Sequence, residues 1–282
     1  MSIGTYNRFL LAAILTLVFC SCKNGNTNTQ ASAEGEETMV SGFLNTKTEP
    51  QTKSASSSFT YVRGGKGVIL KRTAYTVSYN KETRCPNWVA WHLTKNHTQG
   101  SYKRDGMKFT EDEEVKTPRA TNSDYYRSGY DRGHMCPSGD NKWSYTTQKE
   151  SFLFTNICPQ NHDLDAGVWN DLEQACRHWA NIYGEVWIVC GPVYKGSNHK
   201  KIGKNKVVVP EQFFKVVLTK KNGRYLSLGF LYDNKGGRKP MAEYVRTVDE
   251  IEEITGFDFF SALPDNIENS VEAEAILRDW KK

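Results

Sequence analysis

The sequence predicts an α+β fold in which strands follow one another in hairpins and one long helix lies between the hairpins. Residues 73–79 and 88–93 are rich in β-branched and aromatic side chains, and the polar segment joining them is typical of a hairpin. Residues 214–218 and 225–232 form a second such pair around the turn at residues 220–223. Apolar side chains recur at helical spacing from about Leu164 to Tyr183. Strands and helices therefore occupy separate stretches of the chain.

The 282-residue chain is predicted to hold a single folded domain at residues 59–282. A domain of roughly 225 residues is long enough to bury a sizeable core. Hydrophobic residues make up 38% and charged residues 24% of the chain, as in soluble globular proteins. The formal net charge of +5 favours acidic partners such as nucleic acid, although only weakly.

Residues 1–22 predict an export signal. Arg8 supplies the positive start, and residues 9–19 form an apolar stretch too short to span a bilayer. Ser21-Cys22 then resembles the lipobox of bacterial lipoproteins, so cleavage before Cys22 and lipidation of Cys22 are expected. The alternative is an ordinary secretory signal. Both interpretations export the protein, and the first anchors it to a bacterial membrane, facing the periplasm or the cell exterior.

Residues 23–58 predict a disordered tether. Asn, Thr, Ser, Gly, Glu and Gln dominate this stretch, which cannot bury enough apolar surface to offset the loss of chain entropy. A flexible spacer between a lipid anchor and the folded domain explains this composition.

The remaining elements are short. Thr247 and Glu250 form a capping box, which predicts a helix start. Pro118 and the polar residues around it indicate a loop at residues 103–121, and a lysine-rich loop is expected at 194–206. Further expected elements are a short helix at 146–151, a buried strand at 152–157, a loop at 159–163, a strand at 185–190, a helix at 248–254 and an amphipathic helix at 271–280.

Five cysteines remain when Cys20 and Cys22 are set aside, namely Cys85, Cys136, Cys158, Cys176 and Cys190. An odd number in an exported chain requires an unpaired thiol or an intermolecular bond. A zinc site at Cys158, His162, Cys176 and His178 is an alternative use of two of them. It is disfavoured because no paired C-x-x-C knuckle is present.

The first cluster of chemically active residues is Asp131-Arg132-Gly133-His134. Histidine has an unperturbed pKa of ~6.5 and can act as a base near neutral pH. The planar guanidinium of Arg132 fits a phosphate. The alternative is a surface turn held by an Asp131–Arg132 ion pair. If His134 is a base of ordinary pKa, activity should fall below about pH 6.5.

The second cluster lies on the long helix, where Asp165, Trp169, Glu173 and Arg177 follow one another at spacings of four residues. Asp165 stands at the helix start, where its carboxylate could hold a cation or cap free amides. Glu173 and Arg177 lie one turn apart. A surface ion pair of little energetic value is the plainer interpretation of these two residues.

Together the two clusters resemble the DNA/RNA non-specific endonuclease family, which includes mitochondrial endonuclease G and secreted bacterial nucleases. The similarity extends over roughly residues 75–263. The stretches that carry it are residues 119–122, 128–134, 155–160, 169–173, 191–193, 208–216 and 255–260.

The resemblance implies a ββα-metal active site on a central antiparallel sheet flanked by helices, with His134 at or after a strand end. It implies non-specific hydrolysis of the DNA or RNA backbone with Mg²⁺, or with Mn²⁺ or another divalent cation. The implied roles are His134 as general base, Arg132 beside it, Glu173 fixing a metal-bound water, Arg177 facing the phosphate, Arg104 as an upstream phosphate-binding residue and Asp165 as the metal ligand.

Asp165 departs from the family, which usually has Asn at this position. Hard cations accept oxygen ligands from either side chain, but the added charge changes affinity and charge stabilisation. A catalytically weak, nucleic-acid-binding lipoprotein is therefore one alternative. A toxin nuclease with a cognate inhibitor protein is another.

Overall fold

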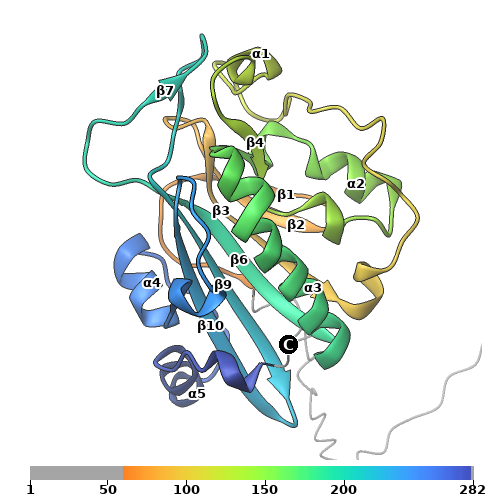
Figure 1. The fold of residues 1–282 in the computed structure, drawn as a ribbon, viewed down its shortest axis with the longest axis vertical. Helices are drawn as coiled ribbons and strands as arrows, with labels where there is room; N and C mark the ends of the chain where they lie inside the picture. The colour runs from red at the N-terminus through yellow and green to blue at the C-terminus, as the bar shows by residue number, and fades with distance from the viewer. Residues whose placement is uncertain (1–59, 281–282) are drawn as a thin grey trace, which may run out of the picture. The chain divides into compact units, whose positions relative to one another are not determined.

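The computed structural model describes residues 60–280, which are built around one seven-stranded sheet (Figure 1). Every neighbouring pair of strands is antiparallel. The strand order is β1 (Val68–Lys71), β2 (Tyr75–Asn80), β3 (Cys85–Thr94), β6 (Glu185–Val193), β9 (Gln212–Lys221), β10 (Arg224–Asp233) and β11 (Val245–Arg246). The α+β prediction and both predicted hairpins are confirmed. The expected signal, the tether and Cys22 lie outside the described residues.

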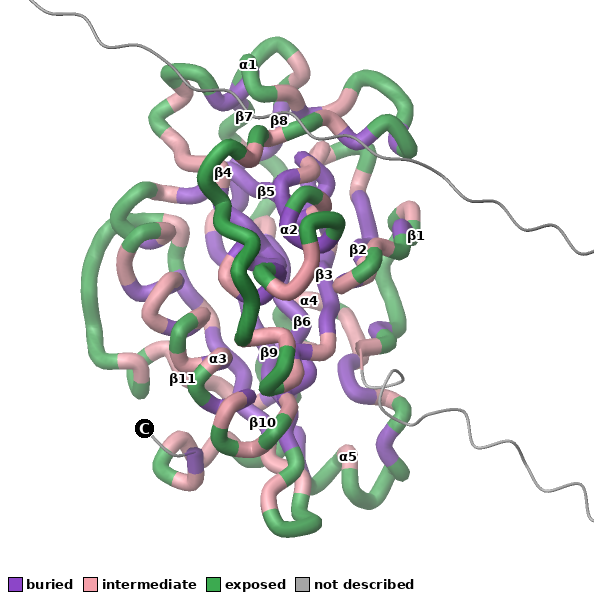
Figure 2. The backbone as a smooth tube through the Cα atoms, turned by 90° about the vertical axis from the view of Figure 1, so that its right-hand side faces the viewer, coloured by how far each residue is buried: buried purple, intermediate pink, exposed green. Residues whose placement is uncertain are grey.

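The sheet is buried on both faces because successive apolar side chains along a strand point to opposite faces. On β3, Val89 and Trp91 pack with the helix α3 (Asn170–Tyr183), whereas Trp88 and Ala90 pack in a second core cluster. The helices α4 (Val248–Thr255) and α5 (Asp265–Glu272) cover that second face. Figure 2 shows the buried backbone of β3, β6 and β9 in the middle of the domain. Flanking helices on a central antiparallel sheet were expected and are confirmed.

Short elements connect these layers. They are α1 (Asn122–Tyr125), α2 (Tyr145–Ser151), and 3₁₀ turns η2 (Lys95–Thr98), η3 (Ser138–Asp140), η4 (Phe154–Asn156), η6 (Met241–Tyr244) and η7 (Leu277–Asp279). The predicted capping box is present, since the Thr247 hydroxyl accepts from the Glu250 amide at 3.1 Å and the Glu250 carboxylate accepts from the Thr247 amide at 2.7 Å. Within residues 60–280, none of the helices has both the length and the apolar character that a membrane span requires.

A smaller two-stranded sheet leads into the long helix. Strand β4 (Asp131–His134) pairs antiparallel with β5 (Ile157–Gln160), placing His134 at a strand end as expected. A π-helical turn, η5 (Leu164–Trp169), then runs directly into α3, with a break at Gly167 (φ −102°, ψ −116°). The helix predicted from about Leu164 to Tyr183 is thus present, as a π-helical turn that continues into α3 with a kink at Gly167.

Several predicted boundaries are wrong. Residues 152–156 form a turn rather than a strand, and Asn156 Nδ2 stabilises it by donating to the carbonyls of Cys136 and Ser151, both at 2.8 Å. The strand is β5, which includes two residues expected to be loop. The expected loop 194–206 contains the start of a hairpin, in which β7 (Lys201–Ile202) pairs with β8 (Val207–Val208).

The last helix is also misplaced by the sequence pattern. The prediction put it at residues 271–280, but α5 ends at Glu272 and the chain then bends. The Ser227 hydroxyl donates to the Val271 carbonyl at 2.6 Å, and Trp280 packs edge-on against Trp179 with ring centroids 4.7 Å apart. The apolar residues of this stretch are therefore buried against separate elements rather than along one helix face.

All five described cysteines are buried and unpaired. The odd number required at least one unpaired thiol, and the described residues contain five. The zinc interpretation is wrong, because Cys158 and Cys176 are buried while His162 and His178 are exposed. Within residues 60–280, these four side chains do not gather into a metal-binding group.

Candidate active site

One cavity of about 680 Å³ is lined by all six residues for which the family resemblance implied a role in the reaction. It lies where β4, the start of α3 and two irregular segments around residues 103–105 and 137–142 meet. The six predicted site residues on its wall are Arg104, Arg132, His134, Asp165, Glu173 and Arg177.

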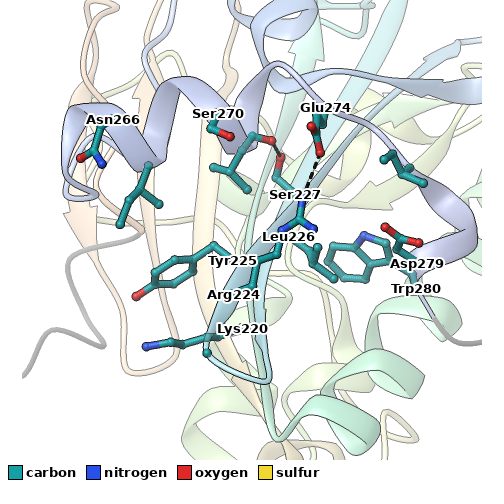
Figure 3. Close-up of a pocket in the computed structure, with 14 residues that line it drawn as sticks. Lys220, Arg224, Tyr225, Leu226, Ser227, Asn266, Ser270, Glu274, Asp279 and Trp280 are labelled. Carbon is teal, nitrogen blue, oxygen red and sulfur yellow. Dashed lines mark hydrogen bonds and ion pairs between the residues drawn. The ribbon is translucent and has the colours of Figure 1, made fainter.

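A second cavity, of about 380 Å³, contains none of these residues. It is formed by the β9–β10 hairpin, α5 and the C-terminal segment, with Arg224 and Glu274 paired at 3.2 Å across it (Figure 3). The predicted chemistry therefore belongs to the larger cavity alone.

Strand β4 aims Arg132 and His134 into the cavity, because residues two apart on a strand share a face. Gly133 between them faces β5, where an added Cβ would lie 2.0 Å from Gln160 Oε1. This close approach, rather than backbone strain, explains the glycine in the motif.

His134 is a buried, neutral imidazole. Its ring packs against Phe109 and Phe152, with centroids 5.3 and 4.9 Å apart, and Nε2 has no hydrogen-bond partner among the described residues. Burial, with the nearby Arg104 charge, lowers the pKa of His134 to about 3. A pKa lowered in this direction moves the acid limb expected from His134 below pH 6.5.

Arg132 is oriented without a carboxylate partner in the described part of the chain. Its Nε donates to Asn122 Oδ1 at 2.9 Å, and its guanidinium lies 5.6 Å from the ring centroids of Phe109 and Tyr125. Asp131 instead pairs with His162 at 2.6 Å. The surface-turn alternative with an Asp131–Arg132 pair is wrong, and the guanidinium remains available to an anion.

Glu173 and Arg177 are not a simple surface pair. Their side chains are 13% and 21% exposed, and their closest charged atoms lie 4.0 Å apart. Arg177 Nη1 makes its shorter contact, 2.9 Å, with Asp140 Oδ1. Asp140 is buried and accepts a hydrogen bond from Trp91 Nε1 at 3.0 Å. Its fixed carboxylate therefore orients the Arg177 guanidinium.

Two charged residues near the site were missed by the sequence analysis, Asp140 and Lys215. Lys215 on β9 is fully buried, and its Nζ lies 4.2 Å from the Trp169 ring centroid with no hydrogen-bond partner among the described residues. Burial raises the pKa of Glu173 to about 7, while the charges of Lys215 and Arg177 oppose that rise. No local pattern marks either residue, because each lies far in sequence from the motif it supports.

Asp165 does not cap the helix. Its carboxylate accepts no hydrogen bond from residues 60–280, and the residue preceding the π-helical turn is Asp163. Burial, with the Asp131 charge, raises the pKa of Asp165 to about 6. An unpartnered carboxylate facing a cavity is a suitable oxygen ligand for a hard divalent cation that keeps most of its waters.

Arg104 comes from an irregular segment and lies across the cavity, with its guanidinium 5.9 Å from the Phe152 ring centroid. Lys103 and Lys142 also line the cavity. Five basic side chains thus share the cavity wall with four carboxylates, those of Asp105, Asp131, Asp165 and Glu173, and with the imidazoles of His134 and His162. This arrangement suits a phosphate whose backbone continues along the surface.

Comparisons with known proteins agree with this geometry. A family model described as DNA/RNA non-specific endonuclease matches residues 53–266. The mitochondrial nuclease EXOG of Xenopus laevis is 36% identical over 204 residues, which cover 67% of this chain and 57% of that protein. Mitochondrial endonuclease G of Bos taurus is 31% identical over 208 residues, covering 69% of this chain and 70% of that protein. The chain thus spans less than two thirds of the length of the EXOG relatives it matches.

The fold also matches a solved structure. A chain in the crystal structure of the EndoG/EndoGI complex superposes with a TM-score of 0.69 at 27% identity, covering 72% of this chain and 89% of that one. The agreement therefore extends well beyond the two motifs.

Proposed function

Because the chain belongs to the DNA/RNA non-specific endonuclease family, we propose that it hydrolyses phosphodiester bonds of DNA, RNA or both without sequence preference. The observation that carries this proposal is the cavity that combines a neutral, unpartnered His134 Nε2 with Asp165 and five cationic side chains. Contacts of this kind address the phosphate backbone and carry no base information.

The residues divide the reaction among themselves. His134 Nε2 accepts a proton from a water molecule as the water oxygen attacks phosphorus. The bond from phosphorus to the leaving oxygen breaks, and that oxygen takes a proton from solvent. Arg132 and Arg177 donate to the non-bridging oxygens, where charge develops.

The remaining site residues orient the reactants. Glu173 faces the cavity with a carboxylate that can accept a hydrogen bond from water, and Arg104 extends the anion-binding wall. The family is known to depend on a divalent metal. A cation held by Asp165, for which we propose Mg²⁺, would add positive charge at the phosphate oxygens.

The direct test uses supercoiled plasmid and a structured RNA. With Mg²⁺ or Mn²⁺ the protein should nick and then linearise the plasmid and release acid-soluble nucleotides, and a chelator should stop cleavage. Retarded migration of both substrates without cleavage in either metal would contradict the proposal and support the nucleic-acid-binding alternative. A protein inhibitor is a further proposed partner, since the matched solved structure pairs EndoG with EndoGI.

The pH dependence should be set by the carboxylates rather than by His134. Asp165 and Glu173 have raised pKa values of about 6 and about 7, so each gains a proton, and loses its ligand or acceptor capacity, as pH falls through those values. His134, with its pKa near 3, remains a base throughout this window. We therefore expect cleavage to fall between about pH 7 and pH 6.

The dependence of the acid limb on metal concentration shows whether Asp165 or another group sets it. Protons and a cation compete for Asp165, so raising Mg²⁺ from limiting to saturating should move the acid limb to lower pH. The measurement is initial rate against pH at both concentrations. A limb that keeps its position at both Mg²⁺ concentrations would exclude Asp165 as its source and leave Glu173, whose pKa is raised to about 7.

We also propose that the precursor is lipidated at Cys22 and associated with a membrane, on the basis of Ser21-Cys22 after the apolar stretch. Cys22→Ser should move the protein into the soluble fraction after cell lysis, while Cys20→Ser should leave it with the membranes. Membrane association that survives Cys22→Ser would refute the anchor.

A further inference from the structure

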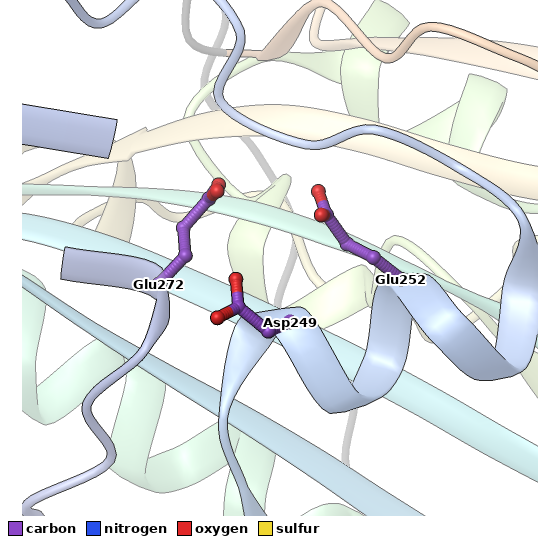
Figure 4. Close-up of side chains that lie close together, drawn as sticks. All are labelled: Asp249, Glu252 and Glu272. Carbon is purple, nitrogen blue, oxygen red and sulfur yellow. The ribbon is translucent and has the colours of Figure 1, made fainter. Parts of the chain in front are cut away.

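Three carboxylates gather outside the catalytic cavity, between α4 and the end of α5 (Figure 4). Asp249 and Glu252 lie on α4, and Glu272 is the last residue of α5. One oxygen from each lies within 4.8 Å of the others. None of the three lines the catalytic cavity, and their helices pack on the sheet face opposite the core of α3. The cluster is therefore separate from the proposed nuclease site.

No protein charge neutralises this cluster in the described part of the chain. Asp249, Glu252 and Glu272 form no ion pair there, and Glu252 Oε1 only accepts from the Phe259 amide at 2.7 Å. The surrounding sequence adds further negative charge. Residues 248–280 contain ten acidic residues and one basic residue, whereas the whole chain carries a net charge of +5. Like charges this close repel one another strongly unless a proton or a cation intervenes.

Glu272 provides an independent observation that points to a ligand at this position. The residue is 4% exposed, and its Oε1 is buried without a hydrogen-bond partner. A buried acceptor left without a donor costs roughly as much free energy as a lost hydrogen bond. The side chain points into the same small space as Asp249 and Glu252 (Figure 4). A group that supplies positive charge at this position would satisfy all three side chains at once.

We propose that Asp249, Glu252 and Glu272 bind a hard divalent cation, and that Ca²⁺ is the ion that fits. All three donors are carboxylate oxygens, the ligands that hard cations prefer. Two oxygens bound to one Ca²⁺ can lie no more than ~5 Å apart, so the cluster is already compact enough. Ca²⁺ accepts irregular geometry and additional waters, whereas Mg²⁺ demands a near-ideal octahedron.

The bound cation would fasten α5 to α4. On the sheet side, the Ser227 hydroxyl of β10 donates to the Val271 carbonyl at 2.6 Å, near the end of α5. A cation shared by Glu272 and the α4 carboxylates would add a charged link at the next residue. The site is thus structural, and its loss should leave the catalytic cavity unchanged.

The experiment measures Ca²⁺ binding in Asp165→Ala protein, in which the proposed catalytic cation site is removed. Calorimetric titration should find one site, and Ca²⁺ at about 100 times its Kd should raise the Tm by roughly 5–10 °C relative to chelator. Adding Glu272→Gln should abolish both responses, and Asp249→Asn provides a second variant should the first fold poorly. Glu274→Gln is the matched control, because it removes the same charge two residues away at an exposed position.

A reciprocal result sharpens the test. In chelator at pH 8, Asp165→Ala protein that also carries Glu272→Gln should have a higher Tm than Asp165→Ala protein, because the neutral amide relieves the repulsion among the three carboxylates. When Glu272→Gln is the single substitution, nuclease activity should equal that of the unsubstituted protein. The proposal is overturned if Asp165→Ala protein gives no Ca²⁺ response, or if Glu272→Gln and Glu274→Gln respond to Ca²⁺ equally.

Discussion

Replacing His134 should reduce the rate of phosphodiester cleavage by at least ~10²-fold, the usual contribution of a general base. The imidazole is the group in the cavity that is neutral at physiological pH and presents an unpartnered nitrogen. Its pKa of about 3 makes His134 a weak base in the free protein. It can therefore accept a proton readily only from a water molecule whose own pKa is lowered in the site. Binding of nucleic acid should survive the substitution, because the cationic side chains of the cavity remain.

The choice of variant matters, because the imidazole also packs against Phe109 and Phe152. His134→Ala leaves a void and is expected to lower the Tm, whereas His134→Gln retains most of the volume. Both should lose activity to the same extent, as measured by initial rates on plasmid at saturating Mg²⁺. His178→Ala, at an exposed position on α3 outside the cavity, is the control and should cleave normally. A His134→Gln protein that retained most of its rate would remove His134 from the mechanism.

The second large effect is expected at Asp165. If its carboxylate binds the catalytic cation, Asp165→Ala and Asp165→Ser should lose most activity with little change in Tm. Asp165→Asn should retain activity at a higher metal concentration, because the amide oxygen is still a ligand but its negative charge is gone. A capping residue would behave differently, since serine is a good cap and would preserve function.

The measurement is rate against Mg²⁺ concentration for the three variants, with thermal melts alongside. Asp163→Ala removes the same charge two residues earlier and serves as the control, because Asp163 does not line the cavity. Wild-type metal dependence in Asp165→Ala would show that the cation is held elsewhere.

The sequence by itself predicted the architecture and brought forward the residues for which we propose catalytic roles. Period-two strands, the turn at Asn222-Gly223 and the capping box at Thr247 are local signals, so the main strands and α4 were predicted close to their observed positions. The six residues expected at the site, taken from two short motifs and one upstream arginine, line one cavity. These features are visible in sequence because each depends on residues within a few positions of one another.

Only the tertiary structure decided how those residues behave. Asp140 holds Arg177 across 37 positions of sequence, and the aromatic rings around His134 come from other segments. The shift of the His134 pKa to about 3 therefore follows from burial, which no local motif encodes. The cluster of Asp249, Glu252 and Glu272 arises in the same way, since two helices that are each ordinary in sequence bring their carboxylates together only when both pack on the same face of the sheet.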